Sequence, residues 1–101
     1  MSAPAEHPRH QLNELVHSPV RFSIMAALAK AESMDFKDLR DAIQVSDSVL
    51  SKQLAILEKA EFVKIRKSFA GKMPRTSASL TAPGRDVWAG HLRTLREIAG
   101  G

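Results

Sequence analysis

The hydrophobic pattern of the chain changes its period once and then changes back. In several segments before residue 60, apolar residues recur every three or four positions, which is the spacing of one face of an α-helix. Over residues 62–81 apolar and polar residues alternate instead, as they do in half-exposed strands. The helical spacing then returns. A chain of 101 residues with this order is expected to form one mainly α domain with a small β-hairpin, an α+β fold.

Short polar residues mark where the helices begin. Ser18 precedes Pro19, and a serine N-cap followed by proline at the first helical position is a start signal. Asp35, Ser46 and Thr81 are placed to start three later helices. We expect helices over residues 10–17, 19–31, 36–44, 46–60 and 82–99, with an extended piece at 34–36 and a hairpin at 62–81. The element order of this domain, residues 10–99, is then α-α-β-α-α-β-β-α, after a disordered tail at 1–9.

Two of these helices, 36–44 and 46–60, are joined by a tight connection and form a helix-turn-helix. The second has leucines along its inner side, and its opposite side carries Ser48, Ser51, Lys52, Ala55 and Lys59. A helix enters the DNA major groove, which is about 12 Å wide, only if its leading residues are small or can bond to base edges. Ser48, Ser51 and Lys52 are therefore predicted to read bases, and Lys59 to contact phosphate.

The positive charge is concentrated in the predicted hairpin. The net charge is +4, yet residues 62–81 hold five cations and no acid. The remainder has 15 − 5 = 10 basic and 11 acidic residues, a net charge of −1. Because a basic patch attracts polyanions, the hairpin is predicted to lie along DNA phosphates or to insert its tip into the minor groove. The residues expected there are Lys64, Arg66, Lys67, Lys72 and Arg75. A surface that merely keeps the protein soluble is the simpler alternative.

The stretches LVHSPVRFSIMAALAK, FKDLRDAIQVSDSVLSKQLAILEKAEFV and SLTAPGR follow one another in this order between Leu15 and Ile98. In order and spacing the chain resembles the winged helix-turn-helix transcriptional regulators of the MarR/ArsR type. It is most similar to the small winged-helix DNA-binding group that lacks a separate effector domain. The resemblance implies a bacterial or archaeal regulator that binds double-stranded DNA as a homodimer on a palindromic operator, more often a repressor than an activator. It also implies that Gln53 touches DNA.

One residue departs from the pattern of those families. In those families the helix that reads DNA, expected here over residues 46–60 and called the reading helix below, is usually followed by a glycine, where the chain turns through a left-handed conformation. This chain has Glu61 at that position. A residue with a Cβ costs on the order of 1 kcal/mol in that conformation. We therefore expect either a turn of a different kind or a slightly longer helix.

The last helix carries an apolar seam. Trp88, Leu92, Leu95 and Ile98 are spaced by four, three and three residues, as on one helical face. Packing against the rest of the same domain is one interpretation. The other is a dimer interface, which Leu12, Leu15 and Val16 of the first helix would join. The second predicts a twofold dimer whose reading helices lie about 34 Å apart, one turn of DNA.

Four histidines raise the question of a metal sensor. His10 and His17 lie two helical turns apart, so they could meet His91 across a dimer, and His7 lies nearby. The chain has no cysteine, however, and no carboxylate spacing that would close a metal site. We expect solvated histidines, no metal and no cofactor, and keep the metal- or ligand-responsive sensor as an alternative.

No catalytic motif is present in the sequence. It lacks the phosphate-binding G-x-x-x-x-G-K-[ST], the dinucleotide-binding G-x-G-x-x-G, and the H-E-x-x-H and G-x-S-x-G motifs of hydrolases. An enzyme is therefore not expected, and a winged helix that binds another protein is the closer rival. The polar N-terminus and the absence of a long apolar run predict a cytoplasmic protein that does not enter a membrane. The operator, the regulated genes and any small-molecule effector cannot be read from the sequence.

Overall fold

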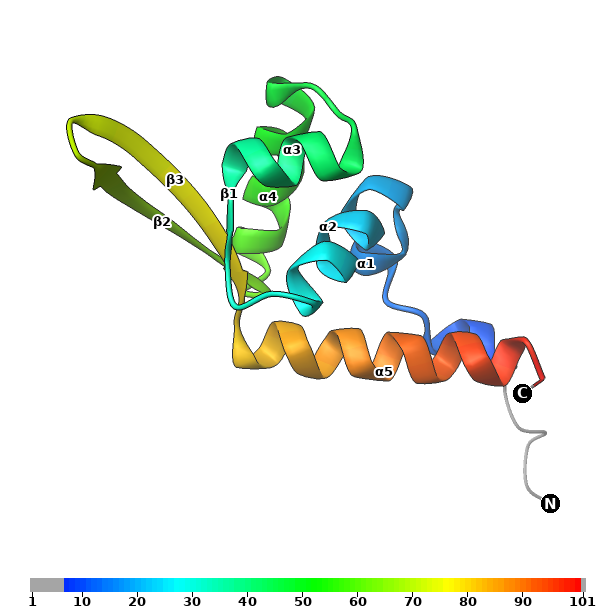
Figure 1. The fold of residues 1–101 in the computed structure, drawn as a ribbon. Helices are drawn as coiled ribbons and strands as arrows, with labels where there is room; N and C mark the ends of the chain where they lie inside the picture. The colour runs from blue at the N-terminus through cyan, green and yellow to red at the C-terminus, as the bar shows by residue number, and fades with distance from the viewer. Residues whose placement is uncertain (1–6, 101) are drawn as a thin grey trace, which may run out of the picture.

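The structure is a computed structural model that describes residues 7–100. The described chain forms a 3₁₀ helix, five α-helices and a small three-stranded sheet, whose β-hairpin projects from the helices at one end (Figure 1). The elements are η1 (Pro8–Gln11), α1 (Glu14–His17), α2 (Pro19–Ala29), β1 (Met34–Asp35), α3 (Phe36–Ile43), α4 (Asp47–Lys59), β2 (Val63–Ala70), β3 (Met73–Leu80) and α5 (Ala82–Ile98). The predicted class, mainly α with a β-hairpin, is confirmed.

The N-terminal region differs from the single helix predicted over residues 10–17. The chain is extended at Leu12, and Asn13 starts a new helix because its side chain accepts hydrogen bonds from the backbone N–H groups of Leu15 and Val16. The prediction was wrong because it overlooked asparagine as a helix cap. The expected tail at 1–9 is also too long: η1 begins at Pro8, and residues 1–6 lie outside the described part of the chain.

Two of the four predicted caps form. The Ser46 hydroxyl accepts from the backbone N–H of Val49 at 3.2 Å, and Thr81 Oγ1 accepts from Gly84 at 2.9 Å. Ser18 and Asp35 occupy the N-cap positions of α2 and α3, but neither side chain bonds to its helix. The position of a short polar residue therefore predicts well where a helix starts. It predicts less well which side chain accepts hydrogen bonds from the first N–H groups of that helix.

The core lies between α2, α3, α4 and the inner face of the sheet. The leucine stripe expected on the reading helix is confirmed, since Leu50 and Leu57 are fully buried and Leu54 is 3% exposed. The whole core consists of Val16, Ile24, Met25, Leu28, Leu39, Leu50, Leu54, Leu57, Val63, Ala78 and Leu80. Because the buried face of α4 lies on this core, its opposite face is left for the surroundings.

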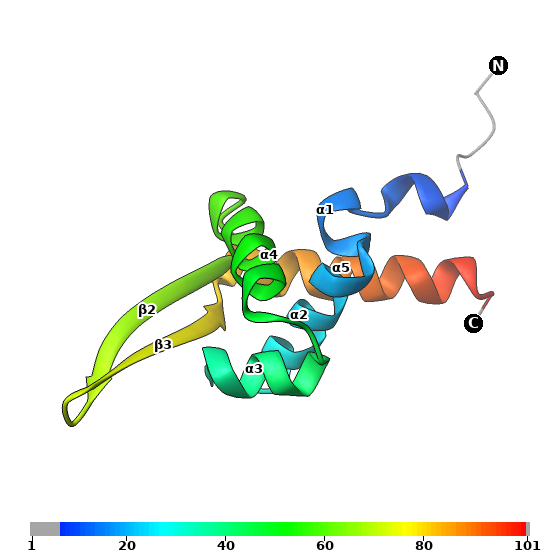
Figure 2. The same cartoon turned by 90° about the horizontal axis from the view of Figure 1, so that it is seen from above.

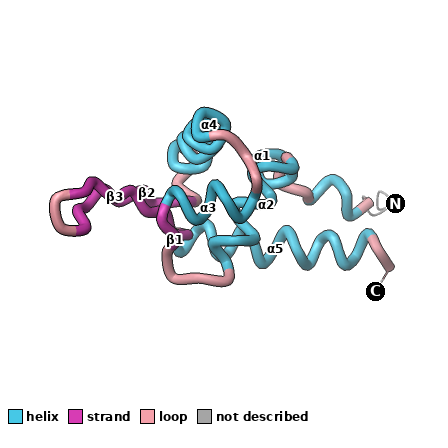
Figure 3. Tube along the Cα trace, turned by 45° about the horizontal axis from the view of Figure 1, so that its top comes forward, coloured by secondary structure: helices cyan, strands magenta, loops and turns pink. Residues whose placement is uncertain are grey.

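The sheet is antiparallel with the strand order β1-β3-β2, and β2 and β3 form a long hairpin (Figure 3). The strands stay paired up to the turn, because Ala70 pairs with Met73 and leaves only Gly71 and Lys72 between them. Gly71 has a φ of +65°, as the first central residue of a type II′ hairpin turn requires. The hairpin is thus a narrow ribbon that stays paired to its tip.

The connection from α4 to the hairpin contains the unusual Glu61. Its φ is +67°, so glutamate adopts the left-handed conformation itself, and neither expected alternative is correct. The backbone N–H groups of Phe62 and Glu61 donate to the carbonyls of Leu57 and Glu58 at 3.0 and 2.9 Å, which is a Schellman helix ending. Thr81 Oγ1 also donates to the Glu61 carbonyl at 2.6 Å. The helix end and the start of α5 therefore hold this turn together.

The molecule is elongated, with principal extents of 66 × 24 × 22 Å. The hairpin projects at one end, and the C-terminal half of α5 projects at the other, with η1 beside it (Figure 2). Among the described residues, no helix has the length and apolar character needed to cross a bilayer.

Candidate nucleic-acid interface

The face of α4 opposite the core is open to solvent. Ser48, Ser51 and Lys52 are all exposed on it, as is Lys59 at its end. Ser48 and Ser46 share a hydrogen bond between their hydroxyls at 3.2 Å, so the first turn presents an ordered polar surface. The side chains are short at the start of the helix, which leaves the room that the floor of a major groove requires.

The one acid at the start of α4 is paired. Arg40 of α3 donates to Asp47 Oδ1 at 2.8 Å and to Asp41 Oδ1 at 3.0 Å. The hydrogen bonds that the Arg40 guanidinium donates to Asp47 and then to Asp41 raise its pKa. The pair offsets the negative charge that Asp47 would otherwise direct at a phosphate. Arg40 was not identified from the sequence as a partner of Asp47.

Gln53 is half-buried and bonded within the chain. Its Oε1 accepts from Arg21 Nη1 of α2 at 2.6 Å, and Arg21 Nε donates to the carbonyl of Leu15. The side-chain carbonyl of Gln53 therefore already has a partner, which leaves its amide NH₂ for any contact with DNA. Arg21 was not anticipated; it connects α1, α2 and the reading helix.

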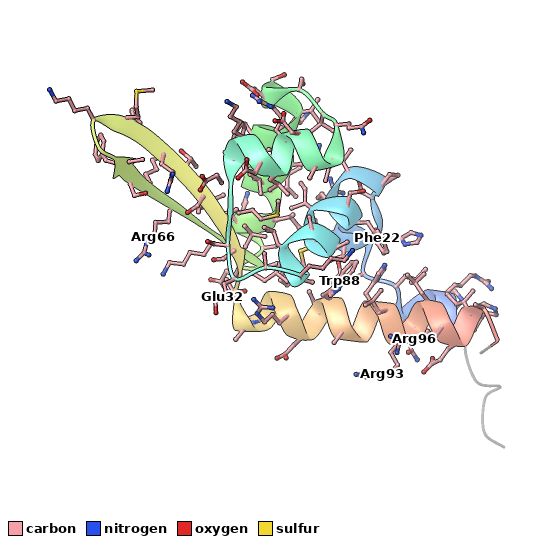
Figure 4. The ribbon with its side chains drawn as sticks, in the orientation of Figure 1. Phe22, Glu32, Arg66, Trp88, Arg93 and Arg96 are labelled. Atoms are coloured by element: carbon pink, nitrogen blue, oxygen red, sulfur yellow. The ribbon has the colours of Figure 1, made fainter. Side chains whose placement is uncertain are left out.

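The hairpin presents its cations on two faces. Residues 63, 65, 67 and 69 alternate with 64, 66, 68 and 70 along β2. Lys67 shares the face that lines a concavity with Ser51 and Ala55 of α4. Lys64 and Arg66 line the opposite face, and Arg66 projects away from α4 in Figure 4. The structure thus brings Lys67 to the reading helix but not Lys64 or Arg66.

The remaining two hairpin cations lie toward the tip. Lys72 is exposed in the turn itself. Arg75 Nε contacts Asp35 Oδ2 at 3.3 Å, which links β3 to the start of α3. Both partners of this ion pair are well exposed, so it contributes about 0–1 kcal/mol and does not prevent Arg75 from engaging phosphate.

Comparison with known proteins identifies this arrangement. Residues 20–99 match the winged helix DNA-binding domain family. The chain belongs to this family. The resemblance to winged helix-turn-helix transcriptional regulators is confirmed by this match and by the structural similarities. No curated protein matches the chain by sequence.

Solved structures show the same winged helix fold. A transcriptional regulator homologue from Pyrococcus horikoshii OT3 is 24% identical with a TM-score of 0.84, and 92% of each chain is covered. NadR in complex with 4-hydroxyphenylacetate is 25% identical with a TM-score of 0.74, covering 92% of this chain and 65% of NadR. The PcaV transcriptional regulator from Streptomyces coelicolor, in complex with its natural ligand, is 15% identical with a TM-score of 0.74; 90% of this chain and 63% of PcaV are covered. The winged helix chain therefore spans less than two thirds of the last two proteins.

The side of the winged helix away from the hairpin holds the residues expected at a dimer interface. Val16 is fully buried in the core of its own chain and has no surface to offer a second one, so that prediction is wrong. Trp88 packs edge-on against Phe22 of α2, with ring centroids 4.8 Å apart (Figure 4). Its ring therefore contacts its own domain. Leu12, Leu92 and Leu95 are half-buried, and Leu15 and Ile98 are each 37% exposed.

The four histidines do not gather into a metal site. Among residues 7–100 no group of three or more potential metal ligands occurs. Only two histidines meet: His17 Nδ1 lies 3.4 Å from His91 Nε2, within one chain. His91 is 2% exposed and its Nδ1 accepts from the backbone N–H of Asn13 at 3.4 Å. Burial, and then the charge of His17, lowers the pKa of His91. Sequence reasoning expected solvated histidines; for His91 that is wrong, because Asn13, His17 and Phe22 lie against its ring.

Proposed function

We propose that this winged helix protein is a transcriptional regulator that binds double-stranded DNA as a homodimer on a palindromic operator. The observation that carries the proposal is the open serine and lysine face of α4 beside a cationic hairpin without acids. Membership in the DNA-binding family supports the same conclusion. Such a protein works where the chromosome is, so we place it in the cytoplasm.

The exposed face of α4 and the β2–β3 hairpin have different roles in DNA binding. Ser48, Ser51 and Lys52 select sequence through base edges in the major groove, and the amide NH₂ of Gln53 reaches the same groove from its flank. Phosphate contacts come from Lys67, Lys72 and Lys59, and from Arg75, which shares the hairpin face of Arg66 but lies closer to the tip. These contacts hold the helix in register without reading sequence. Lys64 and Arg66, on the far hairpin face, act mainly through the long-range field that draws the domain toward DNA.

The dimer is proposed to form through the projecting half of α5 and the segment beside it. An apolar surface made of Leu12, Leu15, Leu92, Leu95 and Ile98 lies there at partial exposure. A twofold axis near this end would leave both reading helices and both hairpins free, as a palindromic site requires. A small domain of this kind also gains stability from covering such a surface.

Repression is the proposed mode of action, since a protein bound over an operator can block it by occupancy alone. A small-molecule effector is a further possibility that the similar structures suggest, because NadR and PcaV were both solved with a ligand. Any such ligand would act on this chain by changing how the two reading helices are held.

Selection of bound duplexes from a random DNA pool tests the proposal. A palindromic consensus with half-sites about one helical turn apart is the expected result. Binding should weaken about 10³–10⁵-fold between 50 and 200 mM salt if roughly 6–10 phosphates are contacted. No enriched duplex, or binding indifferent to salt, would contradict it and favour a protein-binding winged helix.

Matched variants separate the roles of the residues. Ser51→Ala and Lys52→Ala should change the preference among duplexes. Lys67→Ala should weaken all duplexes alike and reduce the salt slope by about 1. Arg66→Ala, a neighbouring cation on the other hairpin face, is the control and should have a smaller effect. Equal effects of Lys67→Ala and Arg66→Ala would show that the strand face does not matter.

A further inference from the structure

The tip of the hairpin carries the two most exposed large apolar side chains of the described residues. Phe69 is 73% exposed and Met73 is 70% exposed, whereas the others in this class are at 37–39%. The six tip residues, 69–74, read FAGKMP, so Lys72 is their only charged residue. The hairpin therefore carries cations along its length and exposed apolar side chains at its tip.

Nothing in the fold accounts for this exposure. Phe69 and Met73 lie outside the core and outside the apolar residues packed on it. A Cβ added at Gly71 would meet no atom within 4 Å, so the turn between them is open on its surroundings. Single exposed apolar residues are common on protein surfaces, but here two of them flank one tight turn. Phe69 pairs with Pro74 and Met73 pairs with Ala70, so the two side chains lie on opposite faces of the hairpin and make its tip apolar on both sides. Contact with a binding partner would remove these apolar side chains from water, which is energetically favourable.

The position of the tip indicates what it meets. Phe69 is on the strand face of Lys67 and Thr76, and these two residues line the concavity shared with the reading helix. In Figure 1 the tip and the N-terminal end of α4 both lie on the side of the molecule away from α5. The tip is therefore on the side of the molecule that would face the same duplex as α4.

We propose that the hairpin tip is an apolar wedge that enters the minor groove and partly unstacks a base step. Phe69 inserts between two base pairs, Met73 on the opposite face of the hairpin packs against the sugars of the groove wall, and Lys72 pairs with a phosphate. Proteins that insert Phe, Met or Pro in this way kink the duplex by about 20–90° toward the major groove. The proposal rests on the proposed function and adds a mode of DNA recognition to it.

Charge and width favour DNA over a protein partner for this tip. Lys67 and Arg75 lie on opposite faces of the hairpin and Lys72 lies in its turn, so the three cations are placed to neutralise phosphates on either side of a groove, a regular pattern of charge that DNA presents. Two paired strands are about 4.8 Å apart before their side chains are counted, and the minor groove is about 6 Å wide. The ribbon therefore needs a widened groove, which insertion of a wedge produces.

The wedge predicts sequence preference outside the bases that α4 reads. Pyrimidine–purine steps, above all TA and CA/TG, unstack most easily. Such a step should recur at a fixed distance from each half-site, where no hydrogen bond reads it. G·C-rich or A-tract flanks should bind less well although the half-sites are unchanged.

The experiment uses the full-length chain and a duplex recovered from the random pool. One base of the flanking step is replaced by 2-aminopurine, whose fluorescence rises on unstacking, and dyes on the two duplex ends report the bend by energy transfer. The variants are Phe69→Ala, Phe69→Leu and Met73→Ala, and Lys72→Ala is the matched tip variant. All three positions are exposed, so circular dichroism should show the same fold as the wild type for each of the four variants.

The wild type should bend the duplex by at least about 20° and raise the fluorescence at the flanking step. Phe69→Ala should abolish both signals and weaken binding roughly 5- to 150-fold, the range for loss of one aromatic–base stack, with the salt slope unchanged. Phe69→Leu should restore part of the bend, since leucine also serves as a wedge. Lys72→Ala should lower the salt slope by about 1 and keep the bend.

Three results would overturn the wedge. One is wild-type binding without bend or fluorescence change, and another is a Phe69→Ala variant that bends DNA like the wild type; both leave DNA binding itself intact. The third is a change of mass in solution on Phe69→Ala, which would make the tip a contact between copies of the chain. Failure to bind any duplex would instead refute the proposed function, and the wedge with it.

Discussion

Gly84→Ala tests how the start of α5 fixes the direction of the hairpin. A Cβ on residue 84 would lie 2.0 Å from the carbonyl oxygen of Phe62 and 2.9 Å from its carbonyl carbon. The same oxygen accepts from the backbone N–H of Thr81 at 3.1 Å. Because both sides of this contact are backbone, no side chain can rotate to relieve it. The helix or the first residue of the hairpin must move.

The magnitude follows from the overlap. Real Cβ atoms essentially never approach within 3.0 Å of another atom, so the shortfall is 3.0 − 2.0 = 1.0 Å. Overpacking costs about 1–3 kcal/mol and occasionally more. Because the contact here joins two backbone segments that cannot rotate apart, we take the upper value, about 3 kcal/mol. Replacing glycine by alanine within a helix gains about 1 kcal/mol. The net loss is about 2 kcal/mol, which lowers the Tm by about 8–16 °C for a domain of this size.

Gly90→Ala is the matched control, because it makes the same chemical change in the same helix. A Cβ there meets nothing within 4 Å, so this variant should gain about 1 kcal/mol and raise the Tm by about 4–8 °C. Thermal unfolding followed by circular dichroism measures both. Below its Tm, Gly84→Ala should also bind DNA more weakly, since Phe62 leads directly into β2. Equal Tm values for the two variants would refute the reasoning.

Three further predictions concern other parts of the chain. Glu61→Gly relieves a left-handed residue with a Cβ and, after the larger entropy loss of glycine, should raise the Tm by about 2–8 °C in the same measurement. Burial and then the charge of His17 lower the pKa of His91. The fold therefore favours the neutral imidazole, and this contribution to stability is fully present above the ordinary histidine pKa of 6.5. It is lost as the pH falls through the lowered pKa of His91 in the folded protein. Denaturant unfolding between pH 5 and 7.5 should show this loss, and His91→Gln should flatten it; an unchanged pH slope would contradict the role of His91. Ile98→Glu, which places a charge on the proposed dimer surface, should shift sedimentation equilibrium toward monomer, and a persistent dimer would move the interface elsewhere.

Much of the fold could be predicted from the sequence because its signals are local. The change from helical to alternating spacing located the hairpin, and the leucines of the reading helix identified its buried face. Ser46 and Thr81 marked two helix starts because their hydroxyls bond within one turn. The residues at which the strands end could not be predicted in the same way, since pairing across the turn depends on the partner strand as well as on the segment itself.

The parts that escaped prediction depend on contacts between distant segments. Nothing near Gln53 in sequence indicates that Arg21 holds it, and nothing near Arg75 indicates Asp35. Alternation places Lys67 and Arg66 on opposite faces, but only the packed fold shows which face the reading helix shares. The apolar residues beside Gly71 were a signal available in the sequence, since large apolar side chains are unusual at an exposed turn.

The elongated shape affects how the association state can be determined. Gel filtration separates by hydrodynamic size, and a rod-like chain elutes ahead of a sphere of equal mass. With one axis of 66 Å and two of 24 and 22 Å, a lone subunit would be assigned too large a mass from its elution volume. Rotational diffusion would likewise be anisotropic, so amide relaxation rates should differ between α5, which lies along the long axis, and helices that cross it. Light scattering or sedimentation, which report mass independently of form, is therefore the appropriate standard for counting subunits.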